Sequence, residues 1–113
     1  MKKIFVSYTY KDKNVNREFL RKVQIFLKKY SIPYIDIFDN KSLTPQYNIL
    51  QRLSESDILL VINSGERAES KWVNTEIQLA NILNKKILYI TSDSFFEKEV
   101  LERIKRELAK QDK

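Results

Sequence analysis

Residues 57–62 read DILLVI and are apolar at every position after Asp57. A strand with one face in water alternates apolar and polar residues, whereas a strand of a parallel sheet covered by helices on both faces is apolar nearly throughout. This stretch therefore predicts the central strand of an α/β fold. Asn63 and Ser64 follow it, so polar side chains stand where the strand is expected to end.

Outward from this strand, short β-rich runs alternate with longer stretches of helical periodicity, in the order β-α-β-α-β-α-β-α. The other predicted strands are residues 3–8, 34–38 and 86–91. The predicted helices are residues 14–30, 45–55, 71–84 and 94–110. Because crossovers between parallel strands are right-handed, we expect one domain over residues 1–113. Its fold is predicted to be a flavodoxin-like open parallel sheet of about four strands, in the order 2-1-3-4, with helices on both faces.

Local signals set the predicted ends of several elements. Residues 31–33 (SIP) are expected to break the first helix, because proline cannot continue a helix and disfavours helical geometry at the residue before it. Thr44 and Ser70 are the predicted N-caps of the second and third helices. Phe96 is expected on the inner face of the last helix, whose apolar residues recur at helical spacing.

The composition excludes several kinds of chemistry. The chain has no cysteine and no histidine, which excludes disulfides, thiolate nucleophiles, Cys/His zinc sites and imidazole bases. Its single glycine, Gly65, excludes the glycine-rich phosphate loops of the Rossmann and Walker types. Catalysis would have to come from carboxylates, hydroxyls, amides or cations, and we expect no metal site.

The charge balance is basic, with 21 Lys and Arg against 15 Asp and Glu and a net charge of +6. The basic residues are interleaved with acidic ones or lie on the polar side of helical patterns, which is typical of solvated surfaces, so nucleic acid is not favoured as a partner. The apolar stretch at the N-terminus is too short for a signal peptide or a membrane span. We therefore expect a cytoplasmic protein with no membrane partner.

Ligands of open parallel sheets bind at the carboxyl ends of the strands. The loops expected at this edge are residues 9–13, 39–44, 63–70 and 91–94. Glu76 and Trp72 are four residues apart, on one face of the helix that begins there. Glu76 would be a fixed anion beside an aromatic ring, near the positive end of the helix dipole. The simpler interpretation is that Trp72 packs in the core and Glu76 is an ordinary solvated residue.

Three stretches, in order along the chain, carry a family resemblance. Residues 5–8 (FVSY) with Asp12, residues 56–64 (SDILLVINS) and residues 70–77 (SKWVNTEI) resemble motifs of TIR (Toll/interleukin-1 receptor) domains. These motifs are the opening box, the central strand with its serine-containing exit, and the helix that carries the catalytic glutamate of NAD-cleaving members. The resemblance covers about residues 3–92. Because only one helix follows the fourth predicted strand, the chain resembles the short bacterial and archaeal TIR-like branch.

The chain departs from the family pattern at two loops. Residues 43–45 (LTP) stand where the loop after the second strand normally contains a glycine. Residues 9–11 (TYK) stand where some NAD-cleaving members carry arginines.

The resemblance implies cleavage of the N-glycosidic bond of NAD, which would be a substrate and not a bound cofactor. Nicotinamide leaves NAD as a neutral molecule, so the reaction needs a carboxylate that stabilises an oxocarbenium-like ribose and needs no general acid. The implied roles are Glu76 as the catalytic carboxylate, Trp72 as a wall of the pocket and Tyr34 as a stacking partner for nicotinamide or adenine. The implied contacts to the diphosphate are Ser7, Tyr8, Tyr10, Lys11 and Lys71. The simpler alternatives are a sheet-face aromatic for Tyr34 and a solvated charge for Lys11.

Several functions compete at this stage. An NAD glycohydrolase or ADP-ribosyl cyclase would make a signal for a separate effector protein in prokaryotic defence. The resemblance also implies a homo-oligomer or contact with other TIR domains, because TIR enzymes commonly complete their site across two protomers. A scaffold would instead self-associate or dock other TIR domains without turnover. A phosphoacceptor receiver domain needs an aspartate at the end of the third strand, where Asp57 does not lie. A nucleoside deoxyribosyltransferase also uses a carboxylate on an N-glycosidic bond, but the glycine-rich turn expected before its glutamate is absent.

Overall fold

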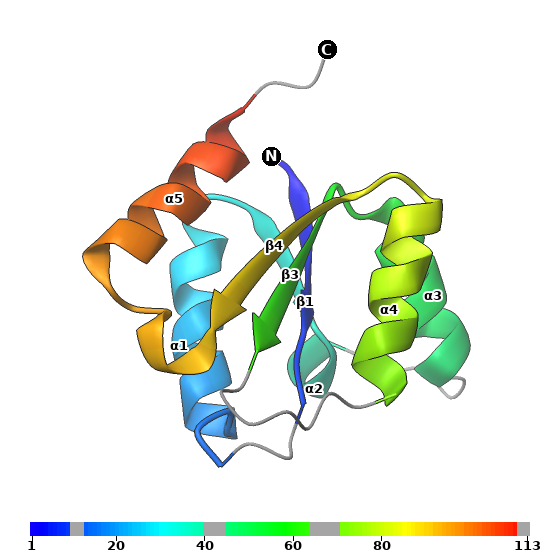
Figure 1. The fold of residues 1–113 in the computed structure, drawn as a ribbon, viewed down its shortest axis with the longest axis horizontal. Coiled ribbons are helices and arrows are strands. Elements are labelled where there is room, and N and C mark those ends of the chain that lie inside the picture. The colour runs from blue at the N-terminus through cyan, green and yellow to red at the C-terminus, as the bar shows by residue number, and fades with distance from the viewer. Residues whose placement is uncertain (10–12, 40–44, 64–70, 111–113) are drawn as a thin grey trace.

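The computed structural model describes residues 1–9, 13–39, 45–63 and 71–110, and its four strands form one parallel sheet in the order β2-β1-β3-β4 (Figure 1). The predicted strand order and α/β architecture are confirmed. The strands are β1 (Lys3–Ser7), β2 (Ile32–Ile35), β3 (Ile58–Asn63) and β4 (Lys86–Thr91). The helices are α1 (Arg17–Lys28), α2 (Asp36–Asp39), α3 (Pro45–Glu55), α4 (Lys71–Ile82), the 3-10 helix η1 (Ser92–Ser94) and α5 (Lys98–Ala109).

The central strand β3 is buried on both faces, as its sequence predicts. Helices α1 and α5 cover one face of the sheet, and α3 and α4 cover the other (Figure 1). Ile58, Leu60 and Ile62 join the cluster under α1 and α5, whereas Leu59 and Val61 join the cluster under α3 and α4. The two helix layers therefore pack on alternate side chains of the same strand.

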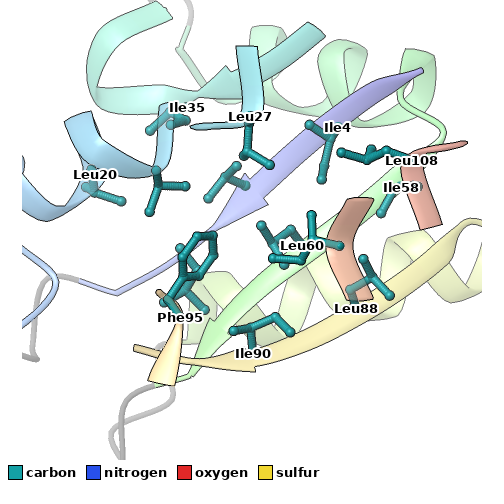
Figure 2. Packing of buried hydrophobic residues seen from close by; sticks show 14 of the residues in the cluster. Ile4, Leu20, Leu27, Ile35, Ile58, Leu60, Leu88, Ile90, Phe95 and Leu108 are labelled. Carbon is teal, nitrogen blue, oxygen red and sulfur yellow. The ribbon is translucent and has the colours of Figure 1, made fainter. Parts of the chain in front are cut away.

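Phe95 closes the cluster under α1 and α5 (Figure 2). It is fully buried and meets Phe19 and Phe26 edge to face, with ring centroids 5.9 and 6.4 Å apart. The prediction that Phe96 is the inward residue is wrong, because α5 begins only at Lys98 and the turn before it directs Phe95 inward and leaves Phe96 exposed.

The second strand lies earlier than predicted. It spans Ile32–Ile35, and residues 36–38, expected as part of the strand, belong to the short helix α2 (Asp36–Asp39). Pairing with β1 begins before the proline, since the Ile32 N–H donates to the Lys2 carbonyl at 2.9 Å. The strand then ends where the Asp39 carboxylate accepts the Ile35 N–H at 2.8 Å and the chain turns.

Most other predicted boundaries are close to those observed, and β4 and α3 agree with them at both ends. The first helix begins at Arg17, because the Asn16 side chain caps it by accepting the Phe19 N–H at 2.9 Å. The third long helix ends at Ile82, ahead of Asn84, which has a positive φ of 57° and so cannot continue a right-handed helix. The predicted caps Thr44 and Ser70 lie outside the described residues.

We predict that Leu60→Ala lowers the free energy of unfolding by about 2–5 kcal/mol, because it leaves a cavity in a strand that is closed on both sides. Urea denaturation measures this change. Ile25→Ala is the matched control, since Ile25 lies on α1 and is 56% exposed. A loss at Leu60 no larger than that at Ile25 would contradict the assignment of β3 as the doubly covered strand.

Candidate active site

Glu76 lies in the second turn of α4 and reaches the end of β1. The Ser7 hydroxyl, on the last residue of β1, donates to Glu76 Oε1 at 2.8 Å, and both side chains are buried. Glu76 is 5% exposed and Trp72, one turn earlier, is 38% exposed, which is the reverse of the simpler interpretation of these two residues. The topology explains the placement, because α4 begins at the carboxyl edge of the sheet and helical side chains lean toward the helix N-terminus.

Burial raises the pKa of the Glu76 carboxyl from 4.5 to about 7. The hydrogen bond from Ser7 lowers this pKa in part, because it stabilises the carboxylate, and the negative charge of Asp36 raises it. Glu76 is therefore poised to change its protonation state near neutral pH, which is a property common at functional sites.

Asp36 is the second acidic residue of the site, at the start of α2 directly after β2. The Tyr34 hydroxyl donates to Asp36 Oδ1 at 3.4 Å and accepts from the Asn48 side-chain amide at 3.1 Å. Sequence reasoning missed Asp36 and Asn48. A second strand that ended at Ile35 would have placed the first of them directly after the strand, at the carboxyl edge of the sheet. No comparable signal pointed to Asn48.

Tyr34 is packed within the protein. It is 8% exposed, and its ring stacks on Phe5 with centroids 5.1 Å apart. Burial, together with the charge of Asp36, raises the pKa of the Tyr34 hydroxyl to about 12, so this hydroxyl stays neutral. A surface pocket of about 280 Å³ lies against Tyr34, between β2 and the end of α3. Its other lining residues are Lys3, Ile32, Pro33, Asp39, Arg52, Glu55 and Ser56.

The remaining predicted site residues are partly brought together. The Tyr8 hydroxyl accepts the Ile37 N–H at 3.2 Å, which joins the end of β1 to α2. Lys71 is exposed at the first residue of α4. Tyr10 and Lys11 lie outside the described residues. Within the described ranges, no three acidic side chains gather closely enough to hold a metal ion, and no helix has the length and apolar character to span a membrane.

The family described as Thoeris protein ThsB, TIR-like domain, matches residues 5–95. The chain belongs to this TIR-like family. The match runs from β1 to the residue after η1, so α5 lies beyond it.

Other comparisons concern the fold of this TIR-like domain. Among solved structures it is similar to the 2-desoxiribosyltransferase from Leishmania mexicana, with a TM-score of 0.65 and 14% sequence identity. The alignment covers 80% of the present chain and 65% of that chain, so the TIR-like domain spans less than two thirds of the enzyme. At this identity the likeness concerns the fold alone. A search of curated proteins gives no match.

We predict that Glu76 makes stability fall as pH rises from about 4.5 to about 7. The folded state holds the Glu76 proton more tightly than the unfolded chain, so its stabilising contribution is complete below pH 4.5 and is lost as pH rises through the folded pKa. The difference corresponds to about 3 kcal/mol. Urea denaturation should show Glu76→Gln more stable than the native chain at about pH 8 and similar to it at about pH 4. Equal stability at both values would contradict the raised pKa.

We also predict opposite effects for two neighbours of Glu76. Ser7→Ala should raise the pKa of Glu76, because the carboxylate loses a hydrogen-bond donor, and Asp36→Asn should lower it, because a nearby negative charge is removed. Carboxyl NMR titration measures both shifts, with exposed Asp93→Asn as the control. Shifts of the same sign in the two variants would show that these contacts do not set the ionisation of Glu76.

Proposed function

We propose that this domain cleaves the N-glycosidic bond between nicotinamide and ribose in NAD. The observation that carries the proposal is the buried carboxylate of Glu76, held by Ser7 at 2.8 Å and ionising near pH 7 at the carboxyl edge of the sheet. Membership of a TIR-like family supports it, because the sequence around Glu76 resembles the catalytic helix of NAD-cleaving TIR domains.

The chemistry requires one ionised carboxylate. As the bond between the ribose C1′ and the pyridinium nitrogen breaks, the electron pair leaves with neutral nicotinamide and positive charge develops on the ribose. Ionised Glu76 would stabilise that charge from a water-poor position, where electrostatic interactions are strong. The bound pyridinium would itself favour the anion, since a neighbouring positive charge lowers a carboxyl pKa. Attack on C1′ by water would complete hydrolysis, and attack by another group of the same molecule would give a cyclic product.

The other residues take supporting roles in this proposal. Trp72, exposed one turn before Glu76, offers an aromatic wall, and Lys71 offers a positive charge at the start of α4. Tyr34 holds Asp36 and Asn48 in place from its buried position, so its proposed stacking on a base would require the ring to become more accessible. Tyr8, Tyr10 and Lys11 remain proposed diphosphate contacts.

The proposed setting is defence signalling in the cytoplasm. The family bears the name of a Thoeris protein, and the TIR resemblance supports a role in which a product signals to a separate effector. Self-association or docking to other TIR domains is the alternative, in which the same fold acts as a scaffold without turnover.

We predict that the purified chain releases nicotinamide from NAD and that Glu76→Gln reduces the rate by about a hundredfold to a thousandfold, because the amide cannot supply the negative charge. Glu99→Gln is the matched control, since Glu99 is exposed on α5. The rate should rise with pH through about 7 as Glu76 ionises. Chromatography of free nicotinamide provides the measurement.

Two outcomes would contradict this function. No nicotinamide release from either dilute or concentrated protein would favour the scaffold. Turnover of nucleosides without cleavage of NAD would favour a deoxyribosyltransferase, whose fold resembles this one.

A further inference from the structure

The two edges of the sheet differ in their free hydrogen-bonding groups. On β2, the Ile32 N–H donates to the Lys2 carbonyl at 2.9 Å, on the side of β1. The main-chain groups of residues 33 and 35 therefore point to the opposite side, the free edge of the sheet. Pro33 has no N–H, and the Ile35 N–H is bound by the Asp39 carboxylate at 2.8 Å. The edge formed by β2 therefore offers no free main-chain donor to another strand.

Among the described residues, nothing pairs with the opposite edge. Strand β4 has six residues and no proline, and it pairs with β3 on one side. Figure 1 shows β4 crossing in front of β3 and β1, with α4 and α5 on either side and no helix in front of it. Because β4 is the last strand in the order β2-β1-β3-β4, alternate residues of β4 direct their N–H groups away from β3, to the free edge. Such an edge is a template for pairing with another strand.

On the α4 side, the surface beside this edge has little charge. From Trp72 to Asn84 the sole ionisable side chain is Glu76, which is buried. Ile82 is 76% exposed at the end of α4, and Tyr89 is 48% exposed in the middle of β4. Low charge combined with exposed aromatic and aliphatic side chains is typical of the centre of a protein interface.

Charge also indicates which partner this surface fits. The chain carries a net charge of +6, and α1 and α5 expose several lysines and arginines, so two copies repel each other at most faces. On the α4 side of β4, two copies can meet without placing like charges together, because residues 72–84 carry no lysine or arginine. Symmetric self-association also allows one patch to serve both partners.

We propose that β4 is a self-association edge, at which two copies pair their β4 strands antiparallel about a two-fold axis and join their sheets. Alignment about Tyr89 pairs residues 87–91 of both copies and leaves Lys86, the one charged residue of β4, outside the paired region. Tyr89 then lies opposite Tyr89 of the second copy, and Leu88 lies opposite Ile90. This assembly does not depend on whether Glu76 cleaves NAD.

Sedimentation of the full chain tests the proposal. We expect a species of twice the 13.5 kDa chain mass that dissociates on dilution. Tyr89→Lys should raise the dissociation constant at least about tenfold, because it places a charge opposite its own symmetry mate at the joined edge. Ile25→Lys, which adds the same charge at an exposed residue of α1, should leave the constant unchanged. A monomer at concentrations up to about 1 mM, or equal effects of the two variants, would overturn the proposal.

A cross-link provides an independent test, because the native chain has no cysteine. Residues directly opposite each other in an antiparallel pair have Cα atoms about 4.5–5.5 Å apart, within the range of a disulfide. Tyr89→Cys should therefore give a covalent dimer on oxidation, and Ile25→Cys should not. Equal cross-linking of the two variants, or none in either, would show that Tyr89 does not lie at a two-fold axis.

Discussion

Burial of β3 on both faces is the constraint on which the rest of the structure depends. A strand with no polar face needs a helix layer on each side, and crossover helices supply both layers when the strands are parallel. Parallel strands bring their carboxyl ends to one edge. Ser7 at the end of β1, Asp36 after β2 and the first turns of α4 therefore lie together, although they are far apart in sequence. The candidate site follows from the topology before any single side chain is considered.

Within that site, the burial of Glu76 on folding disfavours the charged form of its carboxyl group. Burial favours the neutral acid, Asp36 adds repulsion, and the hydrogen bond from Ser7 does not restore the usual pKa. The protein thus holds a carboxyl group whose anion is poorly stabilised by the residues around it. A cationic ligand would supply the missing attraction, and for a pyridinium glycoside the same anion then faces the developing charge. In the proposed function, the burial that leaves Glu76 poorly solvated is therefore also the reason that it would attract a positively charged substrate.

The sequence predicted the topology better than it predicted local detail. Continuous apolar character identified β3, and helical periodicity with strand spacing led to the observed order of all four strands. The second strand was placed too late because Pro33 was interpreted as a break, although its missing N–H faces a free edge, where it costs no hydrogen bond. The same error hid Asp36. Glu76 was located by helix geometry and resemblance, but its burial depends on long-range packing against Ser7, which no local pattern reports.

The closed edge at β2 has a consequence for any assembly that grows by strand pairing. Because Pro33 has no N–H and Asp39 binds the N–H of Ile35, β2 has no main-chain donor for another strand, and the sheet can be extended only at β4. Pairing of two β4 strands would occupy the open edge of both copies. Growth is then self-limiting. A basic, aromatic-rich chain with two open edges could polymerise without end, whereas this one would stop at a closed pair. In the proposed assembly, the short strand β2 would therefore end the joined sheet on both sides.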